Sequence, residues 1–219
     1  MTPELLLSLQ LGDSAYPSGA FAFSWGLEGA AADGQVDRAS FGAWAAGELL
    51  QRWARFDRPV LAAAWARRGD DLLAYDLEVD RLFWAEPVRR RSAEAGAVFL
   101  AAAARLGSET AARLSDAAHV GRAAGHPPVA QGAVYAEVGL PLDHALAVSA
   151  HMAAQGLASA GVRLGLISAF DGQRVLGDLR PDIAAAIAGT DGADEEPAPF
   201  APISEISMFR PADGRLFVN

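Results

Sequence analysis

The feature that most constrains this chain is the helical spacing of its apolar residues, which runs through almost the whole sequence. In residues 41–56, for example, Phe41, Trp44 and Trp53 fall on one stripe of a helix and Arg52 falls opposite them. Signals for strands are weak, because few segments alternate apolar and polar residues and no Asn-Gly or Asp-Gly turn joins two β-branched runs. The sequence therefore predicts an all-α fold.

We expect a single-domain bundle of about ten helices, since helix start and stop signals recur along the chain. Ser108 is a predicted N-cap. Two interruptions are expected, a restart near Pro59 and a break near Pro181, because proline removes a helical hydrogen bond. The expected helical segments are 3–11, 41–56, 57–67, 70–84, 87–106, a segment from Ser108, 129–138, 143–164, and a last pair on either side of Pro181.

Composition divides the chain into three parts: an all-α domain over residues 1–188, a linker over 189–202 and a tail over 203–219. The linker is acidic and contains prolines, so we expect it to be mobile. The tail becomes apolar and aromatic again. It is expected to dock either on the chain's own core or on a partner, because terminal segments that fold on binding have this composition.

The overall composition excludes several classes of function. A formal net charge of −9 argues against nucleic acid and anionic membranes as partners. Cysteine and lysine are both absent, which excludes disulfides, thiolate nucleophiles, cysteine metal sites, a Walker-type lysine and a Schiff base. Neither a signal peptide nor an apolar run of membrane-spanning length is visible. We expect a soluble cytoplasmic protein without a cofactor.

The glycine-rich opening segment, residues 15–34, raises two alternatives. Residues 22–26 have the spacing of a nucleophile elbow, which would make Ser24 the nucleophile of a hydrolase. The preceding Pro-Ser-Gly run does not resemble a strand, so the ordinary interpretation of Ser24 is a helical hydroxyl bonded to a carbonyl. Glu28 is expected to be either an exposed helical residue or an inward-facing acid that lines a polar crevice or a metal passage.

The remaining polar candidates do not assemble an active site. His119, His126, His144 and His151 lack the three- or four-residue spacing of a helical metal pair. We interpret them as surface or interface residues, with a metal site across a symmetric dimer as the alternative. The basic run 89–91 either meets a partner's acids or forms a solvated face, since cations at a helix start oppose the macrodipole. This profile favours a scaffold or adaptor over an enzyme.

The opening segment closely resembles the N-terminal signature of the urease accessory protein UreF family. That signature is a leucine-rich helix followed by Pro-x-Gly-x-Phe-x-x-Ser-x-Gly-Leu-Glu, matched here by Pro17, Gly19, Phe21, Ser24, Gly26, Leu27 and Glu28. Further landmarks similar to the family's follow in order, at residues 91–96, 125–141, 160–165, 171–176 and 215–217. The resemblance covers nearly the whole chain.

The resemblance implies an all-α homodimer without catalytic activity that helps to load nickel into urease. The partners it implies are UreD (also called UreH), the GTPase UreG and apo-urease, with the family protein bridging UreD and UreG. It implies that the opening motif serves partner binding or nickel passage. It also implies a structural motif and a UreD-binding tail, formed respectively by Arg163, Asp171, Gly172 and Gln173, and by Met208, Arg215, Leu216 and Phe217.

The chain departs from the family pattern in two places. Leu166, Ile167, Ser168 and Ala169 replace a Pro-Leu-Gly-Gln stretch, so we expect that turn and its glutamine to be lost. The end lacks the family's His-Glu pair and closes with Val-Asn instead of Arg-Ser. Two rival functions stay open: a serine hydrolase that uses Ser24, and a helical adaptor for an unrelated GTPase.

Overall fold

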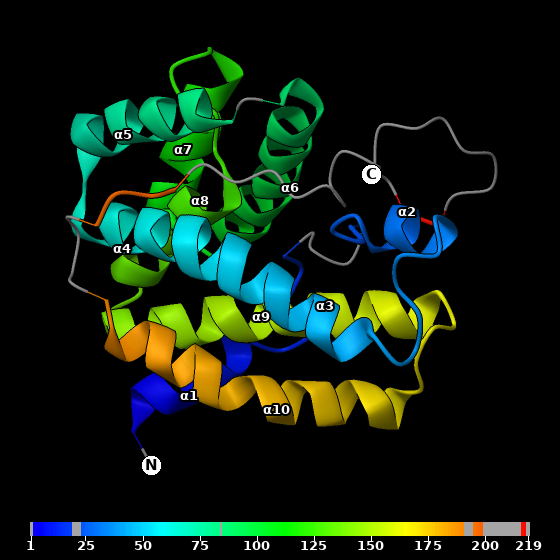
Figure 1. Ribbon diagram of the computed structural model, residues 1–219. Helices are drawn as coiled ribbons and strands as arrows, with labels where there is room; N and C mark the ends of the chain where they lie inside the picture. The colour runs from blue at the N-terminus through cyan, green and yellow to red at the C-terminus, as the bar shows by residue number, and fades with distance from the viewer. Residues whose placement is uncertain (1, 19–22, 84, 191–194, 199–215, 218–219) are drawn as a thin grey trace.

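The computed structural model describes residues 2–18, 23–83, 85–190, 195–198 and 216–217. Within these ranges every regular element is helical, which confirms the all-α prediction (Figure 1). The elements are α1 (Pro3–Leu11), α2 (Leu27–Ala32), α3 (Phe41–Glu48), the π-helix η2 (Leu49–Asp57), α4 (Arg58–Ala66), α5 (Gly69–Leu82), α6 (Glu86–Arg105), α7 (Glu109–His119), α8 (Pro127–Glu137), α9 (Leu142–Arg163) and α10 (Ala169–Ala188). Among the described helices, none combines the length and the apolar character needed to cross a bilayer.

The elements α3, η2 and α4 follow one another without a gap and form one long rod. The predicted restart near Pro59 is confirmed as the start of α4 at Arg58, although it continues the rod and does not interrupt it. A π-helix bonds each N–H to the carbonyl five residues back, and its wider turn leaves room for the proline ring. The carbonyl four residues before Pro59 belongs to Arg55, and it accepts the backbone N–H of Ala198 at 2.9 Å. The buried Arg58 donates through Nε to the Ala54 carbonyl at 2.8 Å. Side-chain and linker donors therefore replace the missing helical bonds.

Part of the predicted linker is bonded to this rod. Arg58 donates to Thr190 Oγ1 at 2.8 Å and forms an ion pair with Glu195. Ala198 adds the backbone bond to the rod described above. The linker residues thus supply acceptors for a buried guanidinium, which needs them because it is removed from water.

The helices α9 and α10 lie side by side and are joined by a short turn (Figure 1). The expected loss of a turn at residues 166–169 is wrong, because Gly165 reverses the chain with φ 70° and Ser168 caps α10. Ser168 and Asp171 bond each other's backbone N–H groups, at 3.2 and 3.1 Å, in a capping box. The expected break near Pro181 is also wrong, since α10 continues through it. Pro181 is exposed, so water can bond the carbonyl that proline leaves unpaired.

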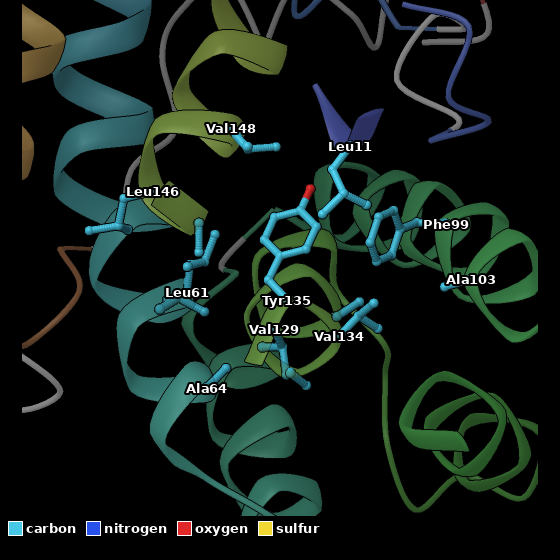
Figure 2. Packing of buried hydrophobic residues seen from close by; sticks show 14 of the residues in the cluster. Leu11, Leu61, Ala64, Phe99, Ala103, Val129, Val134, Tyr135, Leu146 and Val148 are labelled. Atoms are coloured by element: carbon cyan, nitrogen blue, oxygen red, sulfur yellow. The ribbon is translucent and has the colours of Figure 1, made fainter. Parts of the chain in front are cut away.

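The main core cluster is centred on Tyr135 of α8 (Figure 2). Its ring lies among Leu11, Leu61 and Phe99, which come from α1, α4 and α6. The helices α4 and α8 approach closely because α8 has glycine at position 132, where a Cβ would lie 2.4 Å from the Leu61 carbonyl oxygen. This cluster forms the rigid centre of the bundle.

A second core cluster lies where the opening segment, α3, α9 and the tail meet. Its buried members are Leu27, Ala30, Val36, Phe41, Ala45, Leu157, Ala160, Ile167 and Phe217. Figure 1 shows the described end of the chain beside α2. Residues 27–36 and Phe217 of the tail are therefore packed into one small apolar cluster.

Candidate functional site

The opening motif makes a sharp turn into α2. Ser24 is fully buried, and its Oγ accepts the backbone N–H of Glu28 at 3.4 Å. Trp25 and Gly26 follow with φ of 56° and 82°. Glycine adopts this left-handed conformation freely, whereas tryptophan is strained in it. Since strained residues persist where surrounding contacts hold them, Trp25 marks a position that the structure enforces.

Arg52 of η2 packs against the indole ring of Trp25. Its guanidinium carbon lies 4.0 Å from the indole centroid, and its Nε lies 3.8 Å from Asp57 Oδ2. Burial lowers the pKa of Arg52, although Asp57 and Glu48 oppose this effect. Burial raises the pKa of Asp57 to about 6, and the positive charge of Arg52 limits the increase. A partly buried ion pair therefore lies next to the strained turn.

A small cavity adjoins this ion pair. It lies between the opening motif, η2, α6, α8 and α9, and its walls are mainly apolar. The polar side chains that reach it are Ser18, Arg52, Asp57, Arg91, Ser92, Gln131 and Ser149. Ser18, Phe23 and Trp25 of the opening segment therefore form part of the wall of this cavity.

The end of the chain reaches the opening motif directly. The backbone N–H of Leu216 donates to Glu28 Oε1 at 2.8 Å, and Arg163 Nη2 donates to the Leu216 carbonyl at 3.5 Å. Phe217 is buried in the second cluster, with the Arg163 guanidinium 4.1 Å from its ring centroid. Of the two expected docking modes for the tail, these described residues adopt the one on the chain's own core.

Sequence reasoning missed a buried polar network between α5, α6 and the start of α8. The fully buried Asp76 accepts the backbone N–H groups of Gly125 and His126 at 2.8 and 3.3 Å, and that of Ala124 as well. His126 lies 3.0 Å from Asp80 through Nε2 and 2.9 Å from the Ser92 hydroxyl through Nδ1. Burial lowers the pKa of His126, although Asp76 and Asp80 oppose this effect.

The expectation that His126 is a surface or interface residue is therefore wrong, since its side chain is fully buried. Its partners on α5 lie almost fifty residues earlier in the sequence, a separation that no local pattern reveals. The signal that could have pointed to it is Gly125-His126-Pro127, in which a histidine directly precedes the proline start of a helix.

The other polar candidates are resolved by their contacts. The basic run 89–91 pairs with acids of this chain: Arg89 with Asp80 at 3.1 Å, and Arg91 with Glu94 at 2.7 Å. Within the described ranges, no three His, Asp or Glu side chains are grouped as a metal ion would require. These groups therefore support the structure of the bundle.

Comparison with known proteins decides the family. A family model described as UreF matches residues 35–180. The chain belongs to the UreF family.

Similar curated proteins are named urease accessory protein UreF. One from Cereibacter sphaeroides (strain ATCC 17023) is 36% identical over 185 residues, covering 84% of this chain and 81% of the relative. Another from Arthrobacter sp. (strain FB24) is 34% identical over 184 residues, covering 81% and 79%. A third from Agrobacterium fabrum (strain C58) is 35% identical over 167 residues, covering 74% and 71%.

The UreF resemblance inferred from the opening segment is thus confirmed, although the matched range begins just after that segment. Several residues of the UreF signature meet at the second cluster: Leu27 is buried in it, and Glu28 reaches the tail. Arg163 ends α9 beside Phe217. The structure therefore brings both ends of the UreF signature to one place.

The remaining signature residues differ in burial, and some lie outside the described residues. Pro17 and Gln173 are exposed, whereas Gly172 is buried at the start of α10. Asp171 pairs with Arg38 at 2.9 Å, and its hydrogen bonds with Ser168 hold its pKa below the ordinary value. Gly19, Phe21, Met208 and Arg215 lie outside the described residues.

Proposed function

We propose that this chain is a urease maturation chaperone that bridges UreD (UreH) and the GTPase UreG on apo-urease and supports GTP-dependent nickel insertion. In this proposal it acts as a cytoplasmic homodimer, and UreG performs the nucleotide chemistry. Membership of the UreF family and the names of its relatives as urease accessory proteins support this role. The acidic, lysine-free composition is compatible with an adaptor that has no phosphate loop of its own.

One observation favours partner binding at a particular place. The opening motif at one end of the chain and the tail at the other end contact each other through Glu28 and Leu216, next to Arg163. Since the two segments lie almost two hundred residues apart in sequence, this meeting creates a composite surface that exists only in the folded chain. We propose that UreD recognises this surface together with the tail.

Deletion of residues 203–219 tests the role of the tail. We expect the truncated chain to remain a folded dimer, since the main cluster contains no tail residue, and to lose UreD capture. Circular dichroism, light scattering and co-purification with tagged UreD measure these three properties. Undiminished capture of UreD by the truncated chain would contradict the proposal.

Two full-length variants sharpen this test. Met208→Ala removes one apolar side chain of the tail while Phe217 stays in the second cluster. Weakened capture of UreD at an unchanged free energy of unfolding would report contact with the partner. Val98→Ala is the matched control, because Val98 is an exposed apolar residue of α6 outside the family motifs and should leave capture unchanged.

The geometry does not support a hydrolase that uses Ser24, since this serine is fully buried and bonded to the backbone of Glu28. A Ser–His–Asp contact does exist at Ser92, His126 and Asp80. Ser92, however, lies inside α6, whose backbone N–H groups are bonded along the helix and cannot form an oxyanion hole. A fluorophosphonate probe tests both serines, and we expect no labelling.

The remaining rival is an adaptor for an unrelated GTPase. Capture of UreD and UreG by the purified chain separates the two roles, because an unrelated adaptor would bind neither protein. We expect the purified chain to capture UreD and UreG together.

A further inference from the structure

The cavity beside Trp25 has the features of a site for a small molecule. It lies between the opening segment, η2, α6, α8 and α9, and its volume is about 80 Å³. A cavity needs only about 15 Å³ to hold one water molecule. This cavity therefore has room for a small organic molecule, whereas its volume excludes a helix or a strand of another protein.

Aromatic and apolar side chains form most of the cavity wall. Phe23, Trp25, Trp53, Val88, Phe99 and Met152 belong to this part of the lining. The rings of Phe23 and Trp25 are tilted against each other, with their centroids 6.3 Å apart. Small-molecule sites in proteins are typically lined in this way, with a few polar groups that orient the ligand. An aromatic ring fits such walls best, because it packs against other rings at low entropic cost.

A chain of hydrogen bonds ends at the cavity with a donor. Trp53 Nε1 donates to Ser149 Oγ at 3.2 Å, and Ser149 Oγ donates to Gln131 Oε1 at 3.0 Å. An indole nitrogen can only donate, so it fixes the direction of this chain. Gln131 lines the cavity, and its amide nitrogen has no acceptor among the described residues. A ligand that satisfies this nitrogen must therefore offer an acceptor.

The charges around the cavity favour a negatively charged acceptor. Arg52 is balanced by Asp57, with which it pairs, whereas Arg91 adds a second positive charge to the lining. Glu94 bonds Arg91 at Nη1 only and is not part of the cavity wall. A guanidinium carries five N–H donors, so others remain for a ligand. Since the side chain of Arg91 is 31% exposed, this charge lies at the rim, where a ligand can enter.

We propose that this cavity binds a small aromatic carboxylate, with its ring between the aromatic walls and its carboxylate on the amide of Gln131 and the guanidinium of Arg91. A carboxylate accepts hydrogen bonds from both groups at once and forms its strongest bonds with a guanidinium. Phe23 and Trp25 belong to the opening segment, so a bound ligand adds contacts that hold this segment on the bundle. The proposal does not depend on a role in urease maturation.

Titration of the full-length protein with benzoate, toluene and benzylamine tests the ligand class. The three probes share one ring and differ in the charge of its substituent. Tryptophan fluorescence reports binding, because Trp25 and Trp53 line the cavity, and calorimetry gives the affinities. We expect benzoate to bind about tenfold more tightly than toluene, and benzylamine to bind most weakly. No binding of benzoate at millimolar concentration, or tighter binding of toluene or benzylamine, would overturn the proposal.

Variants of the lining locate the site. Ala153→Leu fills part of the cavity and should weaken benzoate binding at least about tenfold. Gln131→Glu keeps an oxygen for the Ser149 hydroxyl but replaces the donor by a negative charge, so we expect a loss of similar size. Val98→Ala is the control, because Val98 is exposed on α6 and does not line the cavity.

Urea denaturation shows whether each variant keeps its fold. Gln131→Met removes the amide without adding a charge, and it replaces Gln131→Glu in the comparison if the buried charge unfolds the chain. Its loss of benzoate affinity should be smaller but measurable. Equal benzoate affinities for the wild type, Ala153→Leu and the Gln131 variants would place benzoate outside the cavity and overturn the proposal.

Discussion

The two core clusters of this protein are built in different ways. The main cluster joins helices through close backbone approach, as at Gly132, and is bordered by the fully buried network of Asp76 and His126. The second cluster joins α2, α3 and α9 with Phe217 from the tail, beside the strained Trp25. The main cluster is made almost wholly of packed helices. The second cluster packs α3 closely against α9, as at Gly161, and adds to this pair the short helix α2 and one residue of the tail.

This difference separates the main cluster, which maintains the fold, from the second cluster, which lies beside the surface proposed to bind partners. Close-packed helices with satisfied polar groups do not rearrange easily, because any shift creates a void or an unpaired donor. Segments held by a few side chains open at lower free energy, and binding surfaces are often drawn from such regions. Leu27 and Glu28 of the opening motif lie on the second kind of region.

The largest effect is expected at the polar network. Asp76→Ala leaves three buried backbone N–H groups without their acceptor, and should lower the free energy of unfolding by about 4 kcal/mol. Urea denaturation measures this value. Asp70→Ala on the same helix is the control, since its side chain is 94% exposed and its removal should change little. Similar values for both variants would mean that the network does not stabilise the scaffold.

The next effect concerns helix contact in the main cluster. Gly132→Ala places a methyl group 2.4 Å from the Leu61 carbonyl oxygen and forces α8 away from α4. We expect a loss of about 3 kcal/mol in unfolding free energy. Gly47→Ala in α3 is the matched control, because nothing lies within 4 Å of its added methyl group, and it should stabilise the helix by about 0.5 kcal/mol.

A smaller effect is expected in the second cluster. Phe217→Ala empties a pocket that adjoins an open groove, so the site can rehydrate and only the end of the chain is released. The unfolding free energy should fall by about 1 kcal/mol, well below the usual value for a central phenylalanine. A loss as large as that of Gly132→Ala would remove the contrast between the two clusters.

The smallest effect depends on pH and concerns the ion pair beneath Trp25. The folded-state pKa of Asp57, about 6, lies above its ordinary value of 3.8, so the folded chain binds this proton more tightly than the unfolded chain. The resulting stabilisation is complete below the ordinary pKa and is lost as the pH rises through about 6. Asp57→Asn should therefore raise stability relative to the wild type by about 1 kcal/mol more at neutral than at acid pH. Urea denaturation at both pH values measures the difference, and a pH-independent difference would contradict it.

Local signals in the sequence predicted much of the scaffold. Ser108 caps α7 as expected, with its side chain accepting the N–H of Ala111 at 3.0 Å. The restart near Pro59 was predicted correctly as the start of α4. The break near Pro181 was wrong, because this proline lies on an exposed face of α10, which a local pattern does not reveal. Fold class therefore follows from periodicity, whereas helix continuity depends on tertiary context.

The candidate site was only partly predictable. The opening motif could be recognised from its residue spacing, but the contact of Glu28 with Leu216 joins opposite ends of the chain. Arg52 was expected opposite the apolar stripe, whereas the wider turn of η2 helps to bring it beneath Trp25 and beside Asp57. Changes of helical period and contacts across the whole chain lie beyond what spacing can show.

The most direct test of the central claim is the mass of the assembly formed when the full-length chain is co-expressed with its matching UreD and UreG. Size exclusion with light scattering gives this mass without assuming which surface binds. The proposed adaptor role predicts one stable assembly that contains a dimer of each protein. A chain that elutes apart from both partners would contradict it.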